Sequence, residues 1–129
     1  VSTKFVGISK SYLSWEDLYY LEQNGATIGN HAHSHSHLVR RGDNETEEEW
    51  LARVESEIIT AKEILNTKGH DSQVFAYPYG EYNKEVRDIV RKLGMIGWRS
   101  TDPRYNLEKY KKSNKNEITN IVFYICFLV

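Results

Sequence analysis

Three helix-start signals, each following a short β-prone run, most constrain what this chain can fold into. Ser14 with Asp17 and Thr46 with Glu49 have the spacing of capping boxes, in which each side chain bonds the other residue's backbone N–H. Asn83 precedes a third helical pattern. Apolar residues then recur at intervals of three and four, and we expect these to face inward: Trp15, Leu18, Leu21; Leu51, Val54, Ile58, Ala61, Leu65; Val86, Ile89, Val90, Leu93.

Short strand-like runs separate the three expected helices, at residues 3–7, 26–30, 73–80 and 95–98. Strands that alternate with capped helices are typical of parallel-sheet units with crossover helices, so the predicted class is α/β. A barrel and an open sheet both fit this alternation. In either case loops meet at the carboxyl ends of the strands, where functional side chains gather.

The size and charge of the chain narrow the classes of partner. A length of 129 residues suits one domain, and a formal net charge of −1 gives no electrostatic reason to expect nucleic acid as a partner.

The single Cys126 excludes an internal disulfide and is expected in a core. The apolar residues 118–129 fall short of the roughly twenty that a membrane-spanning helix needs. We therefore expect no integral membrane segment, no signal peptide in this chain, and further sequence upstream of Val1.

Four histidines alternate along "IGNHAHSHSHL", directly after the expected strand at residues 26–30. On a strand all four would share one face, whereas a turn pairs residues four apart, either His31 with His35 or His33 with His37. The following residues favour a turn that continues into a short helix. Two imidazoles suit zinc, whose catalytic sites usually have three protein ligands, so we expect a carboxylate as the third. A solvated histidine-rich turn is the structural alternative.

Three motifs occur in an order that resembles the polysaccharide deacetylases of the NodB-homology family. They are "GNHAHSH", "FAYPYGEYN" and "GWRSTDPR", and the similarity extends over residues 1–104. The resemblance implies that His31 and His35 are metal ligands and that His33 and His37 stand at variable positions. Residues 105–129 are unlike the family's usual continuation, and we interpret them as a divergent or aberrant tail.

The resemblance also implies a fold, a reaction and a cofactor. The fold would be part of a deformed (β/α) barrel. The reaction would be hydrolysis of a non-peptide C–N amide bond, the removal of acetyl from a polysaccharide or peptidoglycan sugar, with a divalent metal such as zinc. Tyr79 would donate its backbone N–H to the oxyanion, and Tyr77, Pro78, Tyr79 and Asp102 would contact an acetylated carbohydrate. The location implied is extracytoplasmic or in the cell envelope.

Alternatives remain for several of these residues. Tyrosines such as Tyr77 are also common in cores, and Asp102 also suits an ordinary turn. His70 is expected in a surface loop. The sequence alone does not decide between the structural and the functional role of Tyr77 and Asp102.

Departures from the family pattern bear on activity. The family's paired aspartates and its Leu-x-His strand do not occur in this sequence, and Ala76 stands where the family has arginine. We therefore expect these 129 residues alone to bind metal weakly and to release no acetate. A noncatalytic carbohydrate-binding or metal-binding descendant of the same fold is the alternative function, and another metal-dependent amide hydrolase is a third.

Overall fold

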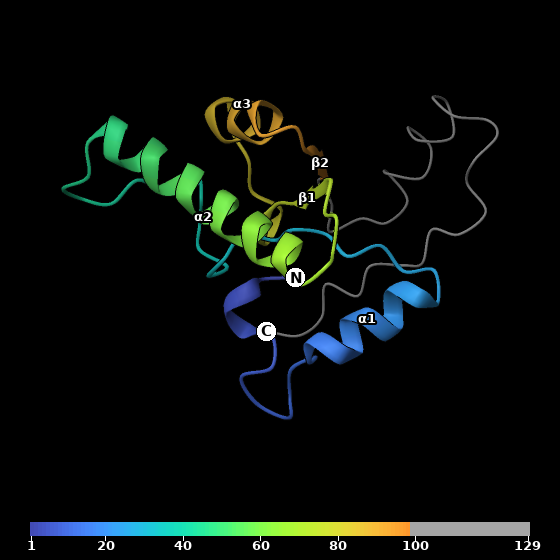
Figure 1. The fold of residues 1–129 in the computed structure, drawn as a ribbon. Coiled ribbons are helices and arrows are strands. Elements are labelled where there is room, and N and C mark those ends of the chain that lie inside the picture. The colour runs from blue at the N-terminus through green and yellow to red at the C-terminus, as the bar shows by residue number, and fades with distance from the viewer. Residues whose placement is uncertain (99–129) are drawn as a thin grey trace.

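A computed structural model describes residues 1–98, and Asp102, Cys126 and the tail at residues 105–129 lie outside the described residues. The chain forms helices around a small parallel sheet (Figure 1). None of the helices within residues 1–98 has the length and apolarity that a membrane crossing requires. The elements, in chain order, are the 3-10 helix η1 (Thr3–Phe5), α1 (Trp15–Gln23), α2 (Glu47–Thr67), β1 (Val74–Ala76), the 3-10 helix η2 (Pro78–Gly80), α3 (Lys84–Lys92) and β2 (Ile96–Trp98).

The three α-helices begin where the capping signals predict. Ser14 and Thr46 both form complete capping boxes, with Asp17 and Glu49 respectively. The Asn83 side chain accepts a hydrogen bond from the backbone N–H of Val86 at 2.9 Å. Each cap satisfies backbone donors that the first helical turn leaves without partners.

The sheet pairs β1 with β2 in parallel, and α3 is the crossover helix between them. Val74 is paired with Ile96, and Ala76 with Trp98. On the other side of β1, Asn30 forms one isolated parallel bridge to Phe75. Of residues 26–30, which were expected to form a strand, only Asn30 pairs with the sheet. The α/β class is confirmed for the described residues, whereas a barrel is not shown.

Three expected elements differ from the prediction. The strand expected over residues 3–7 does not form. Thr3–Phe5 form η1, because Phe5 N–H bonds back to Ser2 O and Lys4 N–H bonds to His33 O, and residues 6–7 form a turn. The strand expected over residues 73–80 ends at Ala76, since the chain enters η2 with positive φ at Tyr79 and Gly80. No short helix follows the histidines, and residues 31–46 form bends and turns.

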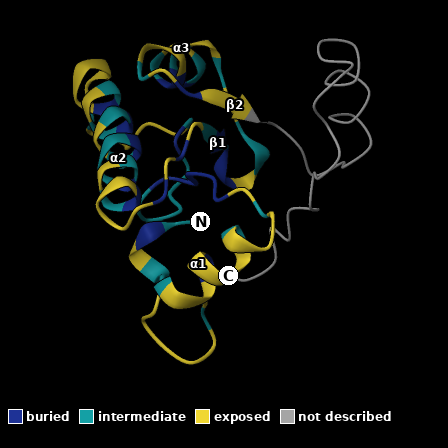
Figure 2. Cartoon of the chain, turned by 45° about the vertical axis from the view of Figure 1, so that its right-hand side comes forward, coloured by how far each residue is buried: buried dark blue, intermediate teal, exposed yellow. Residues whose placement is uncertain are grey.

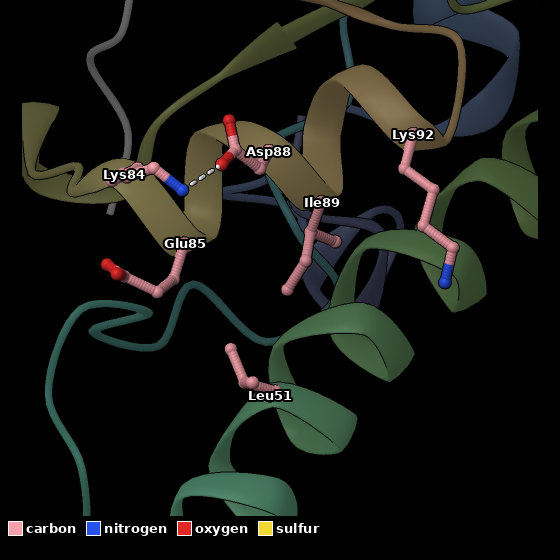
Figure 3. Close-up of a pocket in the computed structure, with 6 residues that line it drawn as sticks. All are labelled: Leu51, Lys84, Glu85, Asp88, Ile89 and Lys92. Carbon is pink, nitrogen blue, oxygen red and sulfur yellow. Dashed lines mark hydrogen bonds and ion pairs between the residues drawn. The ribbon is translucent and has the colours of Figure 1, made fainter.

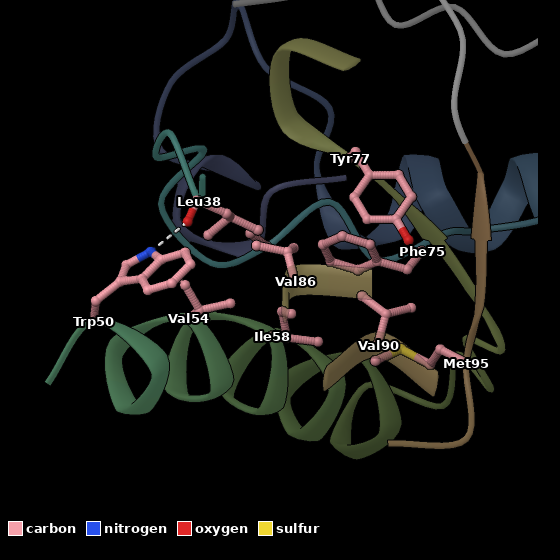
Figure 4. Close-up of a cluster of buried hydrophobic side chains, with 10 residues drawn as sticks. Leu38, Trp50, Val54, Ile58, Phe75, Tyr77, Val86, Val90 and Met95 are labelled. Carbon is pink, nitrogen blue, oxygen red and sulfur yellow. Dashed lines mark hydrogen bonds between the residues drawn. The ribbon is translucent and has the colours of Figure 1, made fainter. Parts of the chain in front are cut away.

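The main hydrophobic core lies between α2, α3 and β1 (Figure 4). The apolar side chains of α2 point toward those of β1 and α3, and the indole Nε1 of Trp50 donates to Leu38 O at 2.8 Å. A second cluster joins Leu18 of α1 to Ile28 and Leu65. The largest members of the main core are Leu38, Trp50, Val54, Ile58, Phe75, Tyr77, Val86, Val90 and Met95.

Helix α1 lies at the opposite end of the molecule from α3, and much of its surface is exposed (Figure 2). Leu18 is buried, but Trp15 is only partly buried and Leu21 is 38% exposed, so the expected inward face is narrower than predicted. His70 corrects another expectation, because its side chain is buried and its Nδ1 bonds Glu22 Oε2 at 2.9 Å. Its ring also stacks on Trp15, so His70 helps to attach α1.

Candidate metal and substrate site

The candidate site forms where two loops leave adjacent parallel segments. The histidine loop starts directly after the Asn30 bridge, and η2 starts at Pro78, two residues after Ala76 ends β1. Because both segments run in the same direction, their carboxyl ends meet at one edge. A hydrogen bond joins the two loops there, from His31 Nδ1 to Ala76 O at 2.7 Å.

Side chains from inside the fold shape the first part of the histidine loop. The buried Asn30 amide donates to Ile58 O of α2 at 2.9 Å, and its Oδ1 accepts from Ala32 N–H at 2.9 Å. These bonds hold Ala32 at a φ of 62°, a left-handed conformation that is uncommon for alanine. The loop is therefore held to α2 at its first residues, directly after the Asn30 bridge.

Glu57 of α2 holds the middle of the same loop. Its carboxylate accepts from both the backbone N–H and the hydroxyl of Ser34, each at 2.8 Å. Its backbone carbonyl accepts from His33 N–H at 3.0 Å. Sequence reasoning did not identify Asn30 or Glu57 as site residues, although Asn30 belongs to the "GNH" lead-in.

The loop brings the rings of His31 and His35 together, with centroids 4.7 Å apart and planes inclined at 63°. His31 is 8% exposed, and burial lowers its pKa to about 4, although the bond to Ala76 opposes this shift. Burial also lowers the pKa of His35. A carbonyl oxygen only accepts, so His31 Nδ1 carries the proton and Nε2 carries the lone pair. Both rings are thus favoured as neutral imidazole, the form that binds metals.

The other two histidines of the run have different partners. The ring nitrogen Nδ1 of His33 bonds Thr3 Oγ1 at 2.9 Å. His37 stacks on Tyr79, with centroids 3.7 Å apart, and its Nδ1 bonds Glu81 Oε2 at 2.8 Å. The pairing of His31 with His35 is therefore the one that the structure forms. That this pair holds a metal stays a prediction.

The expected substrate residues separate into two groups. Tyr79 is 50% exposed, has a φ of 57°, and lies with its ring centroid 4.5 Å from that of His35. Pro78 is buried directly before it. Tyr77 is only 6% exposed and packs edge-on against Phe75, and burial raises the pKa of Tyr77. Tyr79 therefore adjoins the histidine pair, whereas Tyr77 takes the core position that the sequence left open.

The described residues supply part of a ligand set that suits zinc. Within residues 1–98, no three or more side chains of His, Cys, Asp and Glu lie together as a metal site. The described residues therefore offer two neighbouring imidazoles, His31 and His35, which match two of the three protein ligands that a catalytic zinc ion usually has.

A shallow groove also lies between α2 and α3, with a volume of about 410 Å³ (Figure 3). Leu51 and Ile89 form its apolar part, and charged side chains such as Lys84 and Asp88, which pair with each other, surround them. No histidine lines the groove, so it is a feature separate from the histidine pair.

Comparison with a family model identifies the chain. The model of the polysaccharide deacetylases matches residues 2–98, and the chain belongs to this family. A search of curated protein sequences found no significant match to the chain.

Solved structures share the fold at low sequence identity. A family 4 carbohydrate esterase from Streptomyces lividans, in complex with acetate, is 24% identical with a TM-score of 0.54, covering 64% of this chain and 40% of that one. IcaB from Ammonifex degensii is 19% identical with a TM-score of 0.63, covering 77% and 46%. The Streptococcus pyogenes deacetylase PplD, in complex with acetate, is 16% identical with a TM-score of 0.62, covering 84% and 55%. The chain thus spans about half of these relatives or less.

Proposed function

We propose that the protein is a metal-dependent deacetylase that hydrolyses the acetyl amide of a polysaccharide or peptidoglycan sugar. The observation that carries this proposal is the pair of neighbouring imidazoles, His31 and His35, beside the Tyr79 turn at a strand end. Membership of the deacetylase family supports it. So does the acetate bound in two of the similar structures, because acetate is the product of such a reaction. We further propose that the described elements form part of a deformed (β/α) barrel.

Four of the candidate residues have defined roles in this proposal. His31 and His35 are two ligands of a divalent ion such as zinc, which supplies Lewis-acid chemistry by acidifying water and polarising the acetyl carbonyl. The hydrogen bond to Ala76 O orients the His31 ring and selects its tautomer. The backbone N–H of Tyr79 donates to the developing oxyanion, and the Tyr79 side chain contacts the sugar together with Asp102.

Acetate release from acetylated chitooligosaccharides and peptidoglycan tests the proposal. We expect the product of the whole gene, supplied with zinc, to release acetate and His31→Ala to abolish the release, because one of two imidazole ligands is lost. His33→Ala is the matched control, since His33 bonds Thr3 and not His35. We expect the 129-residue chain alone to release none, because the resemblance assigns no base within it.

The outcomes separate the two functions under consideration. Ala76, at the position where the family has arginine, favours a noncatalytic carbohydrate-binding or metal-binding descendant. Carbohydrate binding without acetate release by the whole product would support that alternative. Turnover by the short chain that depends on His31 would mean that a base lies within these residues.

A further inference from the structure

Four aromatic rings form a continuous row across the candidate site. The centroid distances are 4.7 Å from His31 to His35, 4.5 Å from His35 to Tyr79, and 3.7 Å from Tyr79 to His37. The last two rings are nearly parallel, with planes inclined at 11°. The other two contacts in the row are edge-on, with planes inclined at 63° and 65°. Tyr79, from a separate loop, thus links His35 and His37 by contacting both rings.

Both ends of the row are anchored by hydrogen bonds. His31 Nδ1 bonds Ala76 O at 2.7 Å at one end. At the other end His37 Nδ1 bonds Glu81 Oε2 at 2.8 Å, and the second carboxylate oxygen of Glu81 accepts from Arg40 at 3.1 Å. An anchored row restricts the rotation of the rings inside it, namely His35 and Tyr79.

The two inner residues have backbones that need such support. His35 and Tyr79 both have a φ of 57°, in the left-handed region that non-glycine residues seldom adopt. Such conformations persist where the surroundings determine them. The Tyr79 ring contacts the rings of both His35 and His37, and these contacts support the backbone conformations of His35 and Tyr79.

We propose that His37 and Glu81 are positioning residues of the site: through Tyr79 they hold His35 in the orientation that a metal ion requires. His37 stands at a position that the family resemblance treats as variable, and Glu81 has no role in the resemblance. The effect on metal binding rests on the proposed metal site. The arrangement of the rings, in contrast, is a property of the protein without metal. Neither residue touches the reacting atoms in this assignment.

The test compares three variants of the 129-residue chain in two measurements. The variants are His37→Ala, which removes the stack, His37→Phe, which keeps a stacking ring but no bond to Glu81, and Glu81→Ala, which frees His37. Nuclear Overhauser contacts between the rings of Tyr79 and His35 are measured without metal. Zinc affinity is then measured by calorimetry. Glu85→Ala, a change of carboxylate on α3, and His33→Ala, a change in the same loop, are the matched controls.

We expect His37→Ala to weaken the Tyr79–His35 contacts and to lower zinc affinity about 10- to 100-fold, the usual cost of removing an outer partner of a ligand. Glu81→Ala keeps the His37 ring but removes its anchor, so it should change both quantities in the same direction by a smaller amount. His37→Phe should restore most of the ring contacts and of the affinity, and the controls should match the unaltered chain. Unchanged contacts in His37→Ala would overturn the proposal, and so would a His37→Phe variant as impaired as His37→Ala.

The two measurements also separate this inference from the proposed function. Lack of zinc binding by the unaltered chain would count against the metal site, while the ring contacts of the variants would still decide whether His37 and Glu81 position Tyr79 and His35. Loss of the ring contacts without any change in a measurable zinc affinity would overturn the positioning role alone.

Discussion

Glu57 satisfies two hydrogen-bond donors of Ser34 at once, and no other type of side chain at this position would do so equally well. One carboxylate oxygen takes the backbone N–H and the other takes the hydroxyl, each at 2.8 Å. An ionised carboxylate accepts on both oxygens, whereas an amide has only one accepting oxygen. The shape of the histidine loop therefore depends on a charge placed by α2.

Replacing Glu57 by glutamine should destabilise the protein and loosen the histidine loop. The amide leaves one donor of Ser34 without an acceptor in a partly buried site, which costs about 1–3 kcal/mol. Urea denaturation measures the change in the free energy of unfolding. Glu55→Gln is the matched control on the same helix, because Glu55 forms a surface pair with Lys92, and such pairs contribute about 0–1 kcal/mol. Equal losses in the two variants would contradict the role given to Glu57.

At the scale of elements, β2 approaches the core so closely that only a residue without a side chain fits at Gly97. A Cβ added there would collide with the phenol ring of Tyr77, whose hydroxyl oxygen is the nearest atom. Tyr77 is itself held between Phe75 and Tyr82. The ring therefore has little freedom to move aside.

Gly97→Ala should destabilise the fold by about 1–3 kcal/mol, the usual cost of overpacking a core. Near-ultraviolet circular dichroism should change too, since the environment of the Tyr77 ring is altered. Gly42→Ala is the control, because its added Cβ would meet Glu45 only at an ordinary 3.5 Å. A Gly97→Ala variant with the stability of the unaltered chain would show that β2 and Tyr77 are not in close contact.

The turn before α2 gives an expected dependence of stability on pH. Hydrogen bonds from Arg53, and then from the Gly42 backbone, lower the pKa of Glu45 from 4.5 to about 2. The folded state thus binds the proton more weakly than the unfolded state, so the stabilisation is complete above pH 4.5 and is lost as the pH falls toward 2.

Thermal melts between pH 7 and pH 2.5 check this expectation. Glu45→Gln should lose less stability over that range than the unaltered chain, because its turn no longer carries a titrating carboxylate. Glu16→Gln, an exposed change in the first turn of α1, is the control. A Glu45→Gln variant whose melting temperature falls as steeply as that of the unaltered chain would contradict the assignment.

At the scale of the whole molecule, the candidate site connects α2, the β1 edge and the histidine loop, so metal binding should stabilise all of them together. Two imidazoles provide few bonds and no negative charge, so we expect the 129-residue chain to bind zinc weakly. Calorimetric titration and the rise of melting temperature with zinc measure this. His31→Ala and His35→Ala should remove both effects, and His33→Ala should not. Tight one-to-one binding that survives both single changes would indicate ligands beyond the pair.

Helix starts and core faces were predictable because their causes are local. Ser14, Thr46 and Asn83 cap the helices that follow them, and each side chain accepts from a backbone N–H only three residues away. The inward face of α2 follows from spacing: of its predicted members, Val54, Ile58, Ala61 and Leu65 are buried. Leu51, the fifth, is only partly buried. The spacing of the histidines likewise restricted the pairing to two choices.

Tertiary contacts decided what local patterns left open or misjudged. Thr3–Phe5 became η1 and not part of a strand, and the Lys4 N–H of this element bonds His33 O, which lies far along the chain. His70 became buried because Glu22 of α1 provides a partner for its ring nitrogen. The choice of His31 with His35 likewise depends on Glu57 and on the Ala76 carbonyl. The sequence by itself therefore determined the three α-helices and the candidate ligands, since their signals act within a few residues. Only the fold decided which rings meet, since the groups that orient them come from other elements.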